Sequence, residues 1–120
     1  PYTAANVVVV SPSASTWSNI QIGRVGGGGF AGGVLLPNGQ VAMAPFTNSN
    51  IGLVNPAALT FSNIIPNRGG TTSNAWAGAA LAVDGRVVLV PCNSTNVAVL
   101  NTTTPVPSTE FRVAPYFNKF

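Results

Sequence analysis

One repeated phrase limits what this chain can fold into more than any other feature. Residues 34–45 read VLLPNGQVAMAP, and residues 80–91 read ALAVDGRVVLVP. Gly39 matches Gly85 at the same place in both phrases, 46 residues further along the chain. A fixed internal period is typical of repeat architectures, in which neighbouring units bury a shared core.

The second part of the unit occurs three times. The segment NVVVVSPSASTWSNI at 6–20 aligns without a gap on NIGLVNPAALTFSNI at 50–64, and a third copy at 96–113 has a few extra residues. One aromatic residue per unit is expected to pack between neighbouring units: Trp17, Phe61 and Phe111.

Each unit reads as four short strands. The first two are joined by Asn38-Gly39 or Asp84-Gly85, which predicts a two-residue type I′ turn because these residue pairs tolerate positive φ. A proline, Pro45 in the first phrase, then ends the second strand because its nitrogen cannot donate a hydrogen bond. No segment has a persuasive helical period, so the sequence predicts an all-β fold.

Four strands in about 40 to 50 residues are typical of a β-propeller blade. We therefore expect one array of β-propeller-like repeats of short antiparallel strands, with inner strands buried on both faces. It has two complete units and an incomplete third, and closing a ring takes about four to eight. We expect a segment of a longer propeller, an assembling protomer or a fibre subunit. The expected ranges are a partial unit at 1–22, units at 23–66 and 67–113, and a lead into a further unit at 114–120.

Two of these motifs together resemble a known family. LLPNGQV followed by VNPAALTF is similar to galactose-oxidase-type and other kelch-like propellers, where a hairpin precedes a Tyr-Asp-Pro-x-Thr-x-x-Trp segment. Asn55-Pro56 takes the Asp-Pro place, and Phe61 takes that of the closing aromatic residue. The resemblance implies propeller architecture. Pro45 departs from the Gly-Gly that usually follows the second strand, and the chain has no histidine for a copper site.

The composition favours some classes of protein over others. Only 6% of the residues are charged, against about 25% in an average soluble domain. Secreted, cell-surface, phage and virion structural proteins more often have such a composition, so we expect an extracellular, cell-surface or virion location. The net charge of +3 comes from scattered residues, which argues against nucleic-acid binding.

Several kinds of site are excluded by residue counts. One cysteine, Cys92, cannot form an internal disulfide, and without histidine the usual zinc spacings cannot occur. We expect no metal and no cofactor. The apolar stretches are shorter than the about 18 residues that a membrane-spanning helix needs.

Arginines recur at equal spacing between the last strand of one unit and the first strand of the next. They are candidates for anion, sugar or interface contacts, and the alternative is solvated or interface-bridging side chains: Arg24, Arg68 and Arg112. The intervening glycines at 26–29 read as a flexible linker, because the spacing and lysine of a phosphate loop are missing.

Two aromatic residues and two asparagines complete the candidate sites. Phe30 and Trp76 are candidates for a repeated ligand pocket, with packing between strands as the alternative reading. Asn93 and Asn101 begin N-glycosylation sequons, NST and NTT.

The sequence has few residues that could carry out catalysis. The chain has one aspartate, Asp84, in a turn, and one glutamate, Glu110, so a glycosidase-like carboxylate pair is not expected. We predict a non-catalytic structural or binding protein of an extracellular, cell-surface or virion assembly. Its expected partners are copies of itself or flanking repeats, and glycans. The alternatives are an oligomeric carbohydrate-binding lectin and a non-catalytic segment of a larger kelch-like oxidase.

Overall fold

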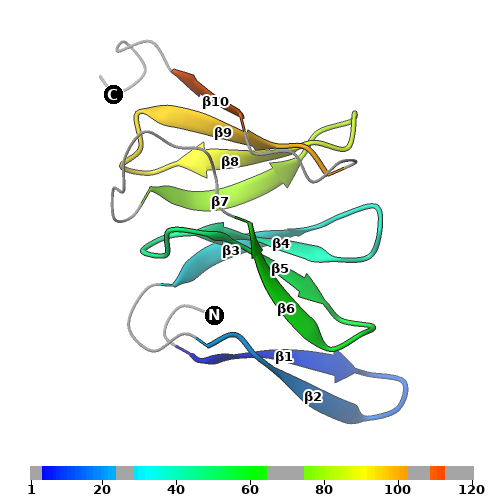
Figure 1. Cartoon of the computed structure of the whole chain (residues 1–120). Helices are drawn as coiled ribbons and strands as arrows, with labels where there is room; N and C mark the ends of the chain where they lie inside the picture. The colour runs from blue at the N-terminus through cyan, green and yellow to red at the C-terminus, as the bar shows by residue number, and fades with distance from the viewer. Residues whose placement is uncertain (1–3, 24–28, 65–74, 103–108, 113–120) are drawn as a thin grey trace.

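The computed structural model describes residues 4–23, 29–64 and 75–102, and the backbone of 109–112. Within these ranges the chain forms three antiparallel sheets and no helix, and none of the sheets closes on itself (Figure 1). The all-β prediction is confirmed for this part of the chain. The predicted linker at 26–29 lies outside the described residues apart from its last glycine.

The first sheet is a two-stranded hairpin at one end of the molecule. β1 (Asn6–Ser11) pairs with β2 (Thr16–Gln21), and the chain turns between them at residues 12–15. Ser15 adopts the left-handed region there, at φ 50°. Leu59 adopts it in the matching turn of the next unit, at φ 53°.

The second and third sheets have the same construction. The second runs in the order β3 (Phe30–Leu35), β4 (Val41–Pro45), β5 (Ile51–Asn55) and β6 (Thr60–Ile64). The third runs in the order β7 (Trp76–Leu81), β8 (Val87–Pro91), β9 (Asn96–Leu100) and β10 (Thr109–Arg112). The prediction that proline ends the second strand of each unit is confirmed, since β4 and β8 both end there.

The hairpin between β3 and β4 is not the predicted type I′ turn. The Gly39 N–H donates to the Leu36 carbonyl at 2.9 Å, and the Leu36 N–H donates to the Gln40 carbonyl at 2.8 Å. Gly39 is left-handed at φ 82°, whereas Asn38 does not have a positive φ. The loop is therefore a type I turn followed by a left-handed glycine. Pro37 fits this turn, because its fixed φ suits the first central position of a type I turn.

The hairpin between β7 and β8 repeats this geometry without the proline. The Gly85 N–H donates to the Ala82 carbonyl at 2.9 Å, and Gly85 has a φ of 84°. The preceding Asp84 accepts a bond from the Arg86 N–H at 3.1 Å, as Asn38 does from the Gln40 N–H at 3.0 Å. A side-chain oxygen that caps the turn is thus common to both hairpins.

A β-bulge redirects the aromatic residue that opens each of these sheets. Phe30 lies opposite Pro45 but Gly32 lies opposite Ala44, so Ala31 is an extra residue in the ladder. The same shift occurs in β7 just after Trp76. Because side chains alternate along a strand, one extra residue turns the aromatic ring onto the other face of its sheet. This bulge was not predicted from the sequence.

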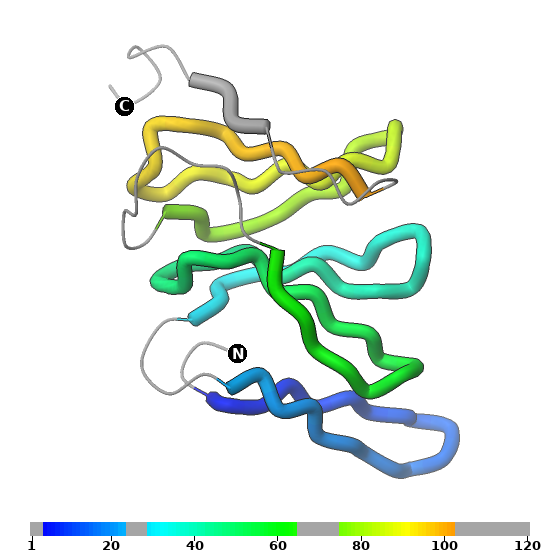
Figure 2. Tube along the Cα trace, in the orientation of Figure 1, coloured from blue at the N-terminus to red at the C-terminus, as the bar shows by residue number. Residues whose placement is uncertain are grey.

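The three sheets are stacked face to face in chain order, as Figures 1 and 2 show. β3 lies against β7, and the Ala75 N–H donates to the Phe46 carbonyl at 3.2 Å across the two sheets. The second sheet is therefore covered on both faces, and β4 is buried along almost its whole length, from Ala42 to Pro45. The loss of alternation expected for inner strands is confirmed there.

Candidate interaction surface

Every sheet in the stack has two faces, which we name by their direction. The forward face points toward the next sheet along the chain, and the backward face points toward the previous one. The contact between the second and third sheets buries Ala42, Ala44 and Ile51 on the forward face of the second sheet. Against them lie residues of the backward face of the third sheet: Trp76, Val87, Leu89, Ala98 and Leu100.

The contact between the first and second sheets is built in the same way. The forward face of the first sheet supplies Ile20 and Ile22, with Val7 and Val9 packed around them. The backward face of the second sheet supplies residues at positions that the third sheet also uses, namely Phe30, Val41, Met43 and Val54, and it adds Phe61. Phe61 contacts Phe30 edge to face, with ring centroids 6.2 Å apart. The same kind of contact therefore occurs twice in one chain.

Among the described residues, no sheet lies against the backward face of the first sheet. Val10 and Trp17 lie directly opposite each other across the hairpin, and their exposed fractions are 63% and 66%. Val8 is on the same face, two residues before Val10, and is also exposed. Phe61 packs between sheets as predicted, whereas Trp17 faces outward in this chain.

The forward face of the third sheet also has no covering sheet within the part of the chain that the structure describes. Ala80 and Val99 flank Val88 in the ladder, so these three residues share one face. Val90, 49% exposed, and the half-buried Val97 extend this face along β8 and β9. Both ends of the stack thus present apolar residues.

The register of β10 in its sheet differs from the register that the alignment of the three copies predicts. Phe111 lies opposite Val97, whereas Phe61 lies opposite Val54 in the second sheet. Val54 corresponds to Leu100 in the third sheet, so Phe111 is not at the register position predicted for it. The extra residues between β9 and β10 account for the change, because they alter where the last strand enters the ladder.

The two aromatic ligand candidates are buried. Trp76 is completely buried between the second and third sheets, and its Nε1–H donates to the Asn96 carbonyl at 3.3 Å. Phe30 is buried between the first and second sheets. Their rings fill the sheet contacts, so neither ring is placed to stack on a ligand from solvent.

The structure brings none of the three candidate arginines into a described site. Arg24 and Arg68 lie outside the described residues, and Arg112 is the last residue of β10, where only the backbone is described. Asn93 and Asn101 are exposed, the first between β8 and β9 and the second just after β9. Exposure is what a glycan acceptor needs, and the two sequons remain predictions.

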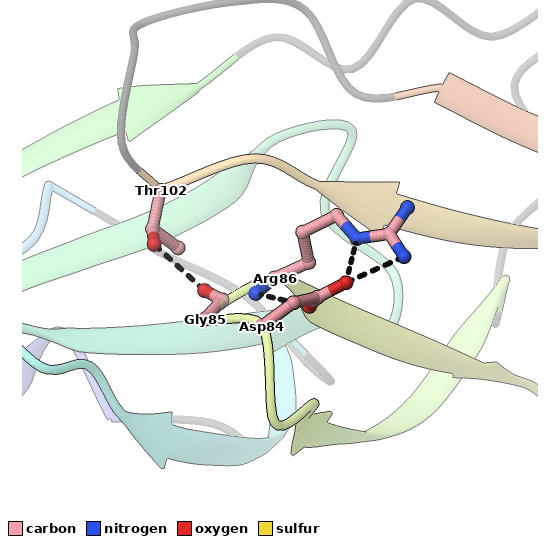
Figure 3. A network of polar contacts seen from close by, with 4 residues as sticks. All are labelled: Asp84, Gly85, Arg86 and Thr102. Atoms are coloured by element: carbon pink, nitrogen blue, oxygen red, sulfur yellow. Dashed lines mark hydrogen bonds and ion pairs between the residues drawn. The ribbon is translucent and has the colours of Figure 1, made fainter.

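One polar cluster holds the tip of the β7–β8 hairpin (Figure 3). The Arg86 Nε–H donates to Asp84 Oδ2 at 2.7 Å, and the Thr102 hydroxyl donates to the Gly85 carbonyl at 2.7 Å. The hydrogen bond from Arg86 lowers the pKa of Asp84 below its ordinary value, and the same bond raises the pKa of Arg86. A carboxylate with a lowered pKa is a poor proton donor, so this cluster is suited to fixing the turn.

Other chemistry has little support in the described part of the chain. It contains no group of three or more His, Cys, Asp or Glu side chains that could hold a metal ion. Cys92 is free and exposed. No helix among the described residues is long and apolar enough to cross a membrane. Comparison with protein-family models, with curated proteins and with solved structures finds no match.

An open array of blades is expected to expose a blade face, but the residues of the two uncovered faces were not predicted from the sequence. The valines of β8 and β9 read as continuous apolar runs, which predicts burial on both sides. A signal was nevertheless present in the comparison of units. Ala42 and Ala44 in the second sheet correspond to Val88 and Val90 in the third, so larger apolar residues stand where no sheet covers them.

Proposed function

We propose that this chain is a non-catalytic structural or binding protein, built of β-propeller-like repeats and displayed outside a cell, at a cell surface or on a virion. The observation that carries the proposal is the repeated contact between sheets. Equivalent positions contribute to both contacts: Val7 and Val9 correspond to Ile51 and Leu53 on the forward faces, and Phe30 corresponds to Trp76 on the backward faces. A unit that stacks on copies of itself is suited to building extended or ring-shaped particles.

The chemistry of the surface supports the same function. The described charged side chains, Asp84 and Arg86, pair with each other at a hairpin tip. Serine, threonine and asparagine instead fill the exposed loops, as at Thr47 and Ser49 before β5 and at Asn93 before β9. Such loops are suited to contacts with glycans or neighbouring subunits.

The proposal is tested by the size and shape of the particle that the purified chain forms. We expect analytical ultracentrifugation and electron microscopy to show filaments or rings built from many copies. A glycan array distinguishes the lectin alternative, which requires saturable binding of one sugar class by a folded particle. Turnover of a substrate by the purified chain would overturn the non-catalytic proposal.

A further inference from the structure

The two uncovered ends of the stack have the properties of two halves of one contact. We infer that the forward face of the third sheet binds the backward face of the first sheet in a second copy, so that copies add head to tail. This inference rests on the proposed structural function and names its partner and its surfaces.

The forward faces of the second and third sheets can be compared position by position. Ala44 and Ile51 in the second sheet are fully buried because the third sheet covers them. Their counterparts in the third sheet are Val90, which is 49% exposed, and the half-buried Val97. These positions are equivalent in sequence and in register, so β8 and β9 present the same forward face as β4 and β5, with no sheet over it among the described residues.

The backward faces give the same result at the other end of the stack. Val10 of the first sheet is 63% exposed, while its counterparts Val54 and Leu100 are almost completely buried by the preceding sheet. Trp17 is more exposed still, while its counterpart Phe61 is half-buried and packs against Phe30. The first sheet therefore presents a backward face without a sheet behind it.

Equivalence also indicates which strands meet. β1 and β2 correspond to β5 and β6, whose backward-facing Val54 and Phe61 pack with Val7, Val9 and Ile20. The counterparts of Val7 and Val9 in the third sheet are Val97 and Val99. A second copy would accordingly set Val10 and Trp17 over Val97 and Val99, on the β9 side of the forward face.

Exposed apolar side chains make the two faces compatible: Val8, Val10 and Trp17 on one, and Ala80, Val88, Val90, Val97 and Val99 on the other. The polar Asn19 and Gln21 lie at the end of the first face, where the register sets them opposite Val8 and Asn6. Burying apolar area is favourable at about 25 cal/mol per Å². Among the residues whose side chains the structure describes, neither face includes a charged residue whose burial would oppose the contact. The two faces are different surfaces, so each bound copy leaves a new face free, and the association extends into a filament or a ring.

The experiment uses one substitution on each face and measures association by sedimentation over about a hundredfold range of concentration. Val10→Lys blocks the backward face, and Val99→Lys blocks the forward face. Leu35→Lys is the matched control, because Leu35 is as exposed as Val10, at 63%, and lies on neither face. Circular dichroism checks that each variant is folded. Val90→Lys replaces Val99→Lys if the latter does not fold.

We expect the wild type and Leu35→Lys to form large particles, and each face variant to remain monomeric. An equimolar mixture of Val10→Lys and Val99→Lys should form a complex that stops at two chains, because one intact face of each kind remains. This result separates a head-to-tail contact from a symmetric one, in which one variant would still associate with itself.

Two results would overturn the inference. The first is a wild type that stays monomeric across the whole range of concentration. The second is association that persists unchanged in both face variants, which would leave the structural function standing but refute the assigned surfaces. Failure of the proposed function would look different, since turnover of a substrate by the purified chain would refute it whatever the state of association.

Discussion

Gly52 has the least free space of the described glycines, in the contact between the first and second sheets. A Cβ atom there would lie 2.8 Å from Met43 Cε, 2.9 Å from Phe61 Cε2 and 3.0 Å from Phe30 Cε1. The methionine is flexible, but the two rings hold each other edge to face and cannot both withdraw. We predict that Gly52→Ala lowers the free energy of unfolding by about 1–3 kcal/mol, measured by urea denaturation.

Gly78→Ala is the control for this substitution. It also adds a Cβ within a strand, but its nearest neighbours are Val90 side-chain atoms at 3.9 and 4.0 Å, which is ordinary contact. Its stability should stay within about 0.5 kcal/mol of the wild type. Equal losses at Gly52 and Gly78 would show that strand glycines are required for reasons other than space.

Asp84 links the stability of its hairpin to pH. Its pKa is lowered in the folded chain by the hydrogen bonds from Arg86, so the folded state binds the proton less well than the unfolded state. The stabilisation is therefore present above the ordinary pKa of the carboxyl group and is lost as the pH falls through the folded pKa. We predict that NMR titration of the Asp84 carboxyl gives a pKa below its ordinary value.

Two variants test this cause. Arg86→Gln removes the side-chain donor, so the pKa of Asp84 should return part of the way, since the backbone N–H at position 86 still donates. Asp84→Asn copies the Asn38 turn of the other hairpin and should remove the contribution of this group to acid destabilisation. A titration curve that is the same with and without the Arg86 side chain would refute the pairing.

The hairpins are the elements where prediction and structure disagree most clearly. In a type I′ turn both Asn38 and Gly39 would need positive φ, whereas in the observed turn only Gly39 does. No atom lies within 4 Å of a Cβ added to Gly39, so the effect of Gly39→Ala is purely one of backbone conformation. We predict a loss of about 1–2 kcal/mol for Gly39→Ala in thermal or urea unfolding.

Asn38→Ala provides the comparison. In the observed turn it removes two exposed hydrogen bonds, one accepted from the Gln40 N–H and one donated to Gln40 Oε1, and should cost less than Gly39→Ala. In a type I′ turn it would also force alanine into the left-handed region. Equal losses from the two substitutions would therefore favour the turn that the sequence predicts over the one observed.

At the level of elements, the sequence predicts whatever depends on local chemistry. The ends of β4 and β8 follow from Pro45 and Pro91, because a missing donor stops the ladder wherever it falls. The extra residue Ala31 has no such chemical signature. The bulge at this residue turns the Phe30 ring toward the first sheet. That contact depends on the packing of two sheets, so the local sequence does not reveal it.

For the whole molecule, the internal repeat predicts the apolar character of both ends but not their exposure. Trp17 has the same place in its unit as Phe61, and sequence alone gives both the same role. The difference is that a sheet lies behind Phe61 and none lies behind Trp17. Burial depends on neighbours, so a repeated sequence cannot distinguish an inner copy from an outer one.

The fluorescence of the two tryptophans can report whether chains associate. Trp76 is fully buried between sheets, and Trp17 is 66% exposed on the face that we assign to a second copy. Trp17→Phe leaves Trp76 as the only tryptophan, and Trp76→Phe leaves Trp17, with a phenylalanine where the preceding unit has Phe30. Phenylalanine keeps an aromatic ring in the core and avoids the loss of about 3–5 kcal/mol expected on truncation to alanine.

In dilute solution we predict blue-shifted, quencher-protected emission from Trp76 and red-shifted, acrylamide-sensitive emission from Trp17. As the concentration rises, head-to-tail association should bury Trp17, so its emission should shift to the blue and its quenching should fall. Trp76 is already covered within each chain, so its emission should not change. Quenching of Trp17 that is independent of concentration, in a sample that sedimentation shows to be associated, would place the contact elsewhere on the molecule.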